Sequence, residues 1–376
     1  MKYYFIAGEA SGDLHASNLI KELVKVDKQA LQQGFGGDLM EKAGMKLTKH
    51  YREMAFMGII PVLMNLKTIK RNFATCEKDI LEFQPDVLIL IDYPGFNLRM
   101  AEFAKKHGIK VYYYISPKIW AWKKNRIKKI KAFVDEMFTI LPFETEFYND
   151  LGYEVNYVGN PSLDSILSTL KPVDFDKFIS ENGLENKPVI ALVPGSRMQE
   201  IKSLLPRMLE GASVFTDYQL VITAAPSIDK TVYEEIMNGY QATLVFDKTY
   251  ETMQHAKAAL VASGTASLEA GIIKVPQIVC YNMAGGVFLL MIAKWLIEVK
   301  WVSLVNIILD REAVRELMQQ HFSIKNIRSE LNLILNDTDH LGEIEKSYQE
   351  FHAKLGKTGA SKRAANLIFE KISEKV

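Results

Sequence analysis

Residues 3–13 of this 376-residue chain read YYFIAGEASGD, an apolar run followed by a turn of small and polar residues. The pattern predicts a buried strand, a tight turn and the start of a helix. Glycine lets a backbone approach a ligand closely, and a helix N-terminus directs unpaired N–H groups into the same space. We therefore expect a polar ligand here. The spacing is not G-x-G-x-x-G, however, so a purely structural turn is the alternative.

The order of strand, turn and helix recurs along the chain. Apolar runs of strand length occupy residues 87–91, 111–115, 137–140 and 155–158, and a second series occupies 188–193, 219–223, 259–261 and 277–280. Strands that alternate with helices are typical of parallel sheets. The sequence thus predicts an α/β fold of two doubly wound, Rossmann-like domains with a cleft between them.

The length suits two domains of about 150–200 residues each. Lys171-Pro172 and the polar stretch 180–187 indicate a boundary. We therefore expect an N-terminal domain over residues 1–170 and a C-terminal domain over 171–310. Beyond Asp310 the strand patterns stop, and residues 311–376 predict a tail of amphipathic helices that packs back on the N-terminal domain or on a partner subunit.

Composition excludes several classes of protein. A formal net charge of +1 argues against nucleic-acid binding driven by bulk charge. Two distant cysteines, Cys76 and Cys280, fit a reducing, cytoplasmic compartment. The longest apolar stretch, 286–299, contains Lys294 and is shorter than the roughly 20 residues that span a bilayer. None of the seven histidines has another at the spacing of a metal site, so we expect no metal and no cofactor.

Two turns in the second half suit phosphate. The first is Val193-Pro194-Gly195-Ser196-Arg197, followed by Glu200. Here Ser196 is expected to cap the helix while Arg197 binds a phosphate through several donors; a plain cap with a surface arginine is the alternative.

The second of these turns consists of Ser263, Gly264, Thr265, Ala266 and Ser267. Its N–H groups and hydroxyls suit a diphosphate, and Glu269 lies where it can accept hydrogen bonds from two ribose hydroxyls. An ordinary N-cap with an acidic first turn would produce the same pattern.

Residues 91–97 read IDYPGFN and place Asp92 at the end of an apolar strand. A carboxylate beside an apolar sheet has a raised pKa, which suits a general base for an alcohol. The competing hypothesis is that Asp92 caps the helix that begins near Phe96.

Two segments of the first half suit a lipid surface. Residues 116–129 read SPKIWAWKKNRIKK, with Trp120, Trp122 and Lys123 expected to face the membrane. Residues 54–64 read MAFMGIIPVLM, and there the membrane-facing residues are expected to be Met57, Ile59, Ile60 and Leu63. A solvated helix face, single-stranded nucleic acid or core packing are the alternatives.

The chain resembles the lipid-A-disaccharide synthase family over nearly its whole length. The resemblance rests on residues 7–13, 91–97, 116–122, 141–144, 194–200 and 263–269, and on Ser303-Leu304 with Asn306. It implies the GT-B fold and an inverting, metal-independent transfer of 2,3-diacylglucosamine from UDP to 2,3-diacylglucosamine 1-phosphate (lipid X), giving a β-1,6-linked disaccharide and UDP. It also implies a peripheral protein on the cytoplasmic face of the inner membrane, without nucleic acid and compatible with a homodimer.

By position, the resemblance implies that Asp92 is the base for the acceptor hydroxyl, with Glu9 and Asn306 as further catalytic candidates. The implied substrate-binding residues are Ser11, Gly12, Asp13, Gly195, Ser196, Arg197, Glu200, Ser263, Gly264, Thr265, Ala266, Ser267, Glu269 and Tyr281.

Four positions depart from the family pattern: Gly95, where many members have a second acidic residue, Asn160, where many have His, and Val305 and Arg315, where we expect Pro. Two other functions stay open: a UDP-N-acetylglucosamine 2-epimerase, and a lipid- or nucleotide-binding protein without turnover.

Overall fold

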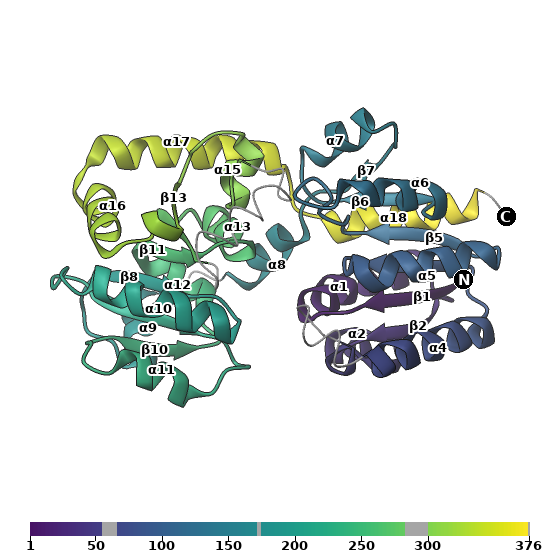
Figure 1. Cartoon of the computed structure of the whole chain (residues 1–376), viewed down its shortest axis with the longest axis horizontal. Helices are drawn as coiled ribbons and strands as arrows, with labels where there is room; N and C mark the ends of the chain where they lie inside the picture. Colours follow the sequence, from purple (N-terminus) through teal and green to yellow (C-terminus); the bar gives the residue numbers. More distant parts are fainter. Residues whose placement is uncertain (55–65, 171–173, 283–299, 375–376) are drawn as a thin grey trace. The chain divides into compact units, whose positions relative to one another are not determined.

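The computed structural model describes residues 1–54, 66–170, 174–282 and 300–374, which form two compact units (Figure 1). Unit 1 comprises Met1–Pro161 with Lys357–Val376, and unit 2 comprises Ser162–Gly356. Each unit is a parallel sheet flanked by helices, which confirms the predicted α/β class. Among the described residues, no helix has the length and apolar character to span a bilayer.

Unit 1 contains a seven-stranded sheet in the order β3-β2-β1-β4-β5-β6-β7. The strands are β1 (Lys2–Ala7), β2 (Leu31–Gly36), β3 (Lys46–His50), β4 (Val87–Ile91), β5 (Lys110–Tyr114), β6 (Glu136–Thr139) and β7 (Asn156–Tyr157). The helices are α1 (Ala10–Val26), α2 (Asp38–Lys42), α4 (Leu66–Phe83), α5 (Pro94–Lys106), α6 (Ile127–Phe133), α7 (Glu144–Asp150) and α18 (Ala360–Ser373), with 3-10 turns η1 (Tyr51–Glu53) and η2 (Lys124–Arg126).

The core of unit 1 lies on both faces of its sheet. Tyr3, Phe5 and Ala7 pack with α1 and α18, whereas Tyr4 and Ile6 pack with α4 and α5. Successive side chains of a strand point to opposite faces, so a central parallel strand covered on both faces is apolar throughout.

Unit 2 contains a six-stranded sheet in the order β10-β9-β8-β11-β12-β13. The strands are β8 (Val189–Val193), β9 (Gln219–Ala224), β10 (Thr243–Phe246), β11 (Ala256–Ala262), β12 (Gln277–Tyr281) and β13 (Arg315–Met318). The helices are α8 (Pro161–Thr169), which starts at the boundary, α9 (Phe175–Asn182), α10 (Met198–Ala212), α11 (Lys230–Met237), α12 (Thr249–His255), α13 (Thr265–Ile273), α15 (Leu304–Leu309), α16 (Ile324–Asn336) and α17 (Thr338–Leu355), with the 3-10 turn η3 (Gln319–His321).

The prediction that strands stop at Asp310 is wrong, because β13 pairs with β12 in parallel. Its Glu316 is buried and accepts hydrogen bonds from the backbone of Val302 and Ser303. Because a charged residue takes a buried position of this strand and its hydrogen-bond partners lie elsewhere in the chain, the strand lacks the apolar pattern by which a buried strand is predicted. The predicted tail is also divided: α16 and α17 belong to unit 2, and only α18 packs in unit 1, beside α1.

The strand order decides which turns meet. In unit 1, β1 lies between β2 and β4, and β4 also pairs with β5. In unit 2, β11 lies between β8 and β12. All these pairs are parallel, so the predicted turns that follow β1, β4 and β5 meet at one edge of the first sheet, and those that follow β8, β11 and β12 meet at one edge of the second. Ligands of open α/β sheets bind at this carboxyl edge.

Candidate active site

The first glycine turn packs directly against the turn that follows β4. A Cβ atom built on Gly8 would lie 2.3 Å from Cδ1 of Tyr93, so only glycine fits beneath that ring. The Tyr93 hydroxyl in turn donates to the carbonyl of Met54. The sequence pattern pointed to Asp92 and missed Tyr93, whose ring joins the two motifs.

Asp92 stands on strained backbone. Its φ is 43° and that of Tyr93 is 46°, two successive non-glycine residues in the left-handed region. Such strain costs about 1–3 kcal/mol per residue and concentrates at functional sites. The Asp92 carbonyl accepts hydrogen bonds from Nδ2 of Asn97 at 2.7 Å and from the hydroxyl of Tyr113. Asn97 and Tyr113, which sequence reasoning also missed, thus hold the strained turn in place.

The environment of the Asp92 carboxyl suits a base. Burial raises its pKa above the ordinary value, and this effect is opposed by the positive charges of Lys118 and Arg126. Tyr93, not Asp92, is the N-cap residue of α5, and no side chain caps that helix. The alternative hypothesis of Asp92 as a helix cap is therefore wrong.

Glu9 lies close to this turn. It is half-buried and is the N-cap residue of α1, whose start carries no side-chain cap. Burial raises the pKa of Tyr93, and the negative charge of Glu9 raises it further. Glu9 and Asp92 therefore both lie near Tyr93, at the carboxyl edge of the sheet.

The neighbours of Glu9 in the motif divide between surface and core. Ser11 is exposed, whereas Gly12 is buried, with a built Cβ 3.3 Å from that of Ala7. Asp13 is 3 % exposed, and its carboxylate accepts three bonds of 3.0–3.1 Å from backbone N–H groups at the start of α2. This geometry gives Asp13 a structural role at the start of α2, and its contact with substrate stays a prediction. His15 is neutral at pH 7, since burial lowers its pKa to about 4.

The two tryptophans behave differently. Trp120 is buried, and its Nε1 donates to the buried carboxylate of Glu144, so the prediction that it faces a membrane is wrong. Trp122 is 44 % exposed, with Lys123 and Arg126 over its ring at 4.3 and 5.1 Å. The other predicted membrane-facing residues, Met57, Ile59, Ile60 and Leu63, lie outside the described residues.

In unit 2, the turn after β8 depends on Gly195, whose φ is +97°. A built Cβ there would lie 2.4 Å from Oε2 of Glu200, which thus folds back over the turn. The predicted cap by Ser196 is wrong. Ser196 is exposed, and the N-cap residue of α10 is Arg197, whose side chain makes no capping hydrogen bond. Nη1 of Arg197 lies 3.3 Å from Oε1 of Glu200. The N–H groups that open α10 are thus without a capping side chain.

The turn after β11 has the same character. Gly264 is the N-cap residue of α13, again without a side-chain cap, so the Ser/Thr cap alternative is wrong. Thr265 is exposed, and Ser263 and Ala266 are half-buried. Ser267 is buried; its hydroxyl donates to the Gly264 carbonyl and accepts from the Leu304 N–H. The structure thus places Ser267 within the fold, and substrate binding by Ser267 stays a prediction.

Two further side chains lie at this edge. Burial raises the pKa of Glu269 to about 7, and the Tyr250 hydroxyl donates to its Oε1 at 3.0 Å. Tyr250 was missed because it comes from α12, before the motif. Burial also raises the pKa of Tyr281, and the charge of Glu200 contributes in the same direction, which places Tyr281 near the turn after β8.

Asn306, predicted to be catalytic, is completely buried. Its Nδ2 donates to the Val314 carbonyl and to Glu316, while its Oδ1 accepts from the N–H groups of Ala313 and Val314. All its hydrogen-bonding capacity holds the connection to β13, so the geometry does not support direct contact with substrate.

The departures from the family pattern are also explained locally. A Cβ on Gly95 would meet open space, so a residue with a side chain would fit at this position. Asn160 is buried and donates to the Ile140 carbonyl at 3.3 Å. Val305 is buried against Gly271, and Arg315 forms surface ion pairs with Glu312 and Glu330.

Two doubly wound α/β units, each with its glycine turns at the carboxyl edge of its sheet, define the GT-B fold class. Solved structures agree on the fold: a calicheamicin glycosyltransferase matches with a TM-score of 0.62 at 12% identity, covering 100% of this chain and 99% of that one. The Methanocaldococcus jannaschii UDP-GlcNAc 2-epimerase, in complex with UDP-GlcNAc and UDP, matches with a TM-score of 0.68 at 14% identity, covering 98% and 100%.

The sequence comparisons identify the family. A family model described as lipid-A-disaccharide synthetase matches residues 3–371. The lipid-A-disaccharide synthase of Geobacter sulfurreducens is 35% identical, covering 99% of this chain and 97% of the relative, and that of Myxococcus xanthus is 36% identical, covering 97% and 96%. The chain belongs to the lipid-A-disaccharide synthase family and is an enzyme of lipid A disaccharide synthesis, with sugar-nucleotide and lipid substrates.

Proposed function

We propose that the enzyme transfers 2,3-diacylglucosamine from its UDP donor to the 6-hydroxyl of 2,3-diacylglucosamine 1-phosphate, with inversion at the anomeric carbon and without a metal ion. The observation that carries the proposal is the Asp92 carboxyl, held on two strained residues at the end of β4, with a pKa raised by burial. Family membership supports the class of reaction.

On the acceptor side, Asp92 removes the proton of the 6-hydroxyl while that oxygen attacks the anomeric carbon. The bond to UDP breaks in the same displacement, and attack from the face opposite the leaving group inverts the configuration. A raised pKa makes the carboxylate a stronger base, and Brønsted behaviour then favours proton transfer. The Tyr93 ring and Glu9 border the same turn and would position the acceptor sugar.

On the donor side, the diphosphate of UDP would rest on the N–H groups that open α10 and α13. Neither helix is capped by a side chain, which supports their use for a ligand. Arg197, at the first of these turns, adds charge-assisted donors. Fixed donors of this kind stabilise the negative charge that grows on the departing UDP. Glu269 would accept hydrogen bonds from the ribose hydroxyls.

We also propose that the protein binds peripherally to the cytoplasmic face of the inner membrane. The support is the exposed ring of Trp122 with Lys123 lying over it. Amphipathic aromatic rings and cations together suit an anionic lipid interface.

The decisive test is a transfer assay with purified enzyme, UDP-2,3-diacylglucosamine and EDTA, with and without the 1-phosphate acceptor. We expect release of UDP and formation of disaccharide only when acceptor is present. Asp92→Asn should lower kcat by about 10²–10⁴-fold, the usual contribution of a general base. Asp150→Asn, an exposed residue of α7, is the control and should leave kcat unchanged.

Release of UDP without disaccharide would refute the transfer and favour an epimerase. Full transfer by Asp92→Asn would refute Asp92 as the base. A requirement for a divalent ion, shown by complete inhibition by EDTA that added ion reverses, would refute the metal-independent mechanism.

A further inference from the structure

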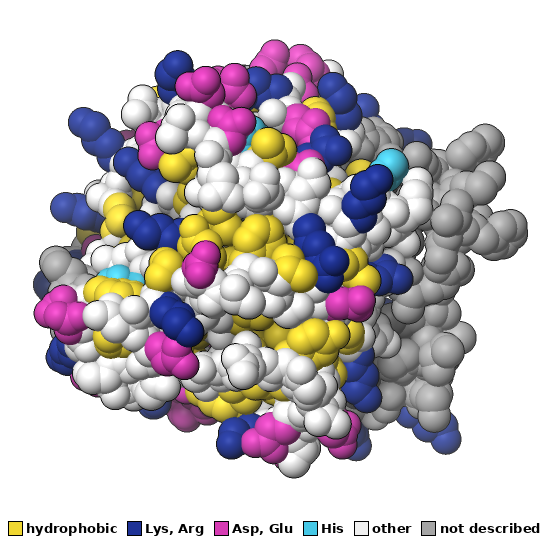
Figure 2. Space-filling view, turned by 90° about the vertical axis from the view of Figure 1, so that its left-hand side faces the viewer, with side chains coloured by type: hydrophobic (Ala, Val, Ile, Leu, Met, Phe, Trp, Pro, Cys, Tyr) yellow, Lys and Arg dark blue, Asp and Glu magenta, His cyan; other side chains and the backbone are white. Residues whose placement is uncertain are grey.

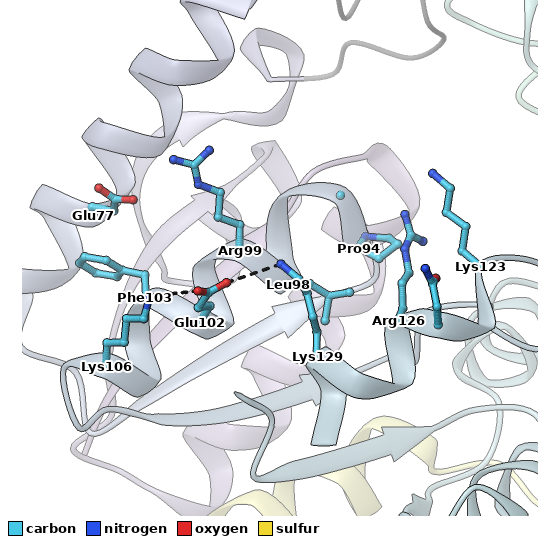
Figure 3. Close-up of a pocket in the computed structure, with 12 residues that line it drawn as sticks. Glu77, Pro94, Leu98, Arg99, Glu102, Phe103, Lys106, Lys123, Arg126 and Lys129 are labelled. Carbon is cyan, nitrogen blue, oxygen red and sulfur yellow. Dashed lines mark hydrogen bonds and ion pairs between the residues drawn. The ribbon is translucent and has the colours of Figure 1, made fainter. Parts of the chain in front are cut away.

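A groove of about 720 Å³ lies in unit 1 (Figure 3), and its lining includes Pro94, two residues after the proposed base in the chain. Its wall begins at Pro94 and Gly95, directly after the Asp92–Tyr93 turn, and follows α5 to Lys106 in its last turn. Over the 13 residues of α5, a rise of about 1.5 Å per residue makes the helix roughly 20 Å long. The opposite wall comes from η2 and α6. The groove is thus long enough to hold a sugar and its substituent.

The lining of this groove is strongly cationic. Its charged side chains are Arg99, Lys106, Lys123, Arg126 and Lys129, against Glu77 and Glu102. Five cations against two carboxylates leave three positive charges in excess. On one outer face of unit 2, by contrast, side chains of both signs are interspersed (Figure 2). Clustered charge of one sign inside a hollow concentrates the potential that attracts an anion.

Internal ion pairs use only part of this charge. Glu102 pairs with Lys106 at 3.0 Å and with Lys129 at 3.5 Å. Arg99 instead lies over the ring of Phe73 at 4.1 Å, and Arg126 lies over Trp122. Stacking on an aromatic ring orients a guanidinium without neutralising it. Arg99 and Arg126 are therefore positioned with their charge still available for a ligand.

Arg126 is also electrostatically coupled to the proposed base. Burial lowers the pKa of Arg126, and the charges of Tyr113 and Asp92 act in the opposite direction. Gly95 has no side chain, and a Cβ there would point into open space. Residue 95 therefore adds no carboxylate that would offset the positive charge at the Asp92 end of the groove. An anion held by Arg126 would lie at the Asp92 end of the groove.

We propose that Arg126 binds a phosphate monoester in this groove, namely the 1-phosphate of the acceptor sugar, while Arg99, whose side chain points away from Arg126 toward α4, contributes only to the positive potential of the groove (Figure 3). The inference rests on the proposed function and extends it by naming the acceptor's anchor. A phosphate monoester carries nearly two negative charges at pH 7 and matches the fork of a guanidinium. Holding the phosphate here would present the same sugar's 6-hydroxyl to Asp92. Anionic phospholipid headgroups share part of this chemistry, so the test must separate the two sources.

The test compares two acceptors, 2,3-diacylglucosamine with and without its 1-phosphate, in the wild type and in Arg126→Gln and Arg99→Gln. We expect Arg126→Gln to raise the KM for the phosphorylated acceptor about tenfold or more and Arg99→Gln to raise it by less, while the KM for the acceptor without phosphate and the KM for the donor stay within twofold in both variants. The matched control is Lys128→Gln, at an exposed position of α6 outside the groove. This variant should leave the KM values for both acceptors and for the donor unchanged.

A binding measurement keeps the proposal testable if transfer itself fails. Isothermal titration of the protein with glucosamine 1-phosphate and with glucosamine should show that only the phosphorylated sugar binds, and that Arg126→Gln weakens this binding about tenfold. Binding with no transfer would refute the proposed function but support the groove. Equal losses for both acceptors, or equal binding of both sugars, would overturn the groove as a phosphate site.

Vesicle binding tests whether the groove binds anionic phospholipid headgroups instead of the acceptor phosphate. Sedimentation with phosphatidylglycerol vesicles should be similar for the wild type, Arg126→Gln and Arg99→Gln if the groove serves the acceptor. If both variants lose sedimentation yet retain their acceptor KM values, the groove binds membrane phosphodiesters and the proposal is overturned. Thermal unfolding of each variant confirms that it is folded.

Discussion

Replacing Asn97 with Leu should damage both the stability and the activity of the enzyme. Asn97 is completely buried, and its Nδ2 donates to the Asp92 carbonyl at 2.7 Å and to the Ile91 carbonyl at 3.1 Å. Leu has a similar volume but no donor, so the variant loses these bonds without leaving a large cavity. The variant thus isolates the hydrogen bonds that hold the strained turn.

The magnitude follows from the two bonds. Leaving a buried acceptor without its partner costs about 1–3 kcal/mol, and the Asp92 carbonyl keeps the hydroxyl of Tyr113, so we expect a loss of about 2–4 kcal/mol in the free energy of unfolding. For a unit of this size, 1 kcal/mol shifts Tm by about 2–4 °C, which gives a decrease of roughly 4–16 °C. Displacement of the Asp92 carboxyl by about 1 Å would lower kcat about 100-fold.

Differential scanning fluorimetry and the transfer assay measure the two effects. Asn149→Leu, an exposed position in α7, is the control and should alter neither Tm nor kcat. Tyr113→Phe completes a double-mutant cycle, and the two losses should not be additive because both side chains donate to the same carbonyl. A Tm within 1 °C of the wild type together with an unchanged kcat for Asn97→Leu would refute the reasoning.

Further predictions concern Glu269, Gly8 and the two tryptophans. The affinity for UDP should rise as pH increases through about 7, because Glu269 then loses its proton and accepts from the ribose; titration calorimetry of Glu269→Gln should show no such rise. Since the pKa of Glu269 is raised from 4.5 to about 7 in the folded state, part of the unfolding free energy should also be lost progressively as pH rises from about 4.5 through 7 in the wild type but not in Glu269→Gln. Gly8→Ala should destabilise unit 1 by about 1–3 kcal/mol through its clash with Tyr93, and less in a Tyr93→Ala background, as measured by urea unfolding. Trp122→Ser should weaken sedimentation with anionic vesicles without lowering Tm, whereas Trp120→Ala should lower Tm because Glu144 loses a donor.

Each of these outcomes has a result that contradicts it. A pH profile of UDP binding that is the same in Glu269→Gln would remove Glu269 from the ribose site. Equal destabilisation by Gly8→Ala with and without the Tyr93 ring would show that the contact is not the cause. Unchanged sedimentation of Trp122→Ser would reject this residue as a membrane contact.

Much of the fold was predictable because its signals are local. The central strands β1, β4, β8 and β11 are apolar in sequence since they are buried on both faces. The strands that escaped notice are β2, β3, β10 and β13, whereas the edge strand β7 was predicted. In β2, Gln33 is buried and donates to Asp79, so its polar side chain hides the strand pattern.

The site was predictable only in part. The positions of Asp92, Arg197 and Glu269 followed from strand ends. Tyr93 and Asn97 lie within the motif 91–97, but nothing in the motif assigned them a role. Tyr113 and Tyr250 lie outside every motif. They act through contacts to residues elsewhere in the chain, such as that between Tyr250 and Glu269. A single sequence without those contacts offers no reason to select them.

By itself the sequence determined the order of strand, turn and helix and the placement of glycine at the turns, because apolar periodicity and backbone freedom are properties of a few adjacent residues. Only the tertiary structure decided which polar side chains remain for chemistry. Asp13, Asn306 and Trp120 have the same motif-like appearance as Asp92 and Trp122, yet their hydrogen bonds are made to distant backbone and carboxylate groups inside the fold. A buried polar group must be satisfied, and whether its partner is the protein or a ligand depends on the packing of segments that are far apart in sequence.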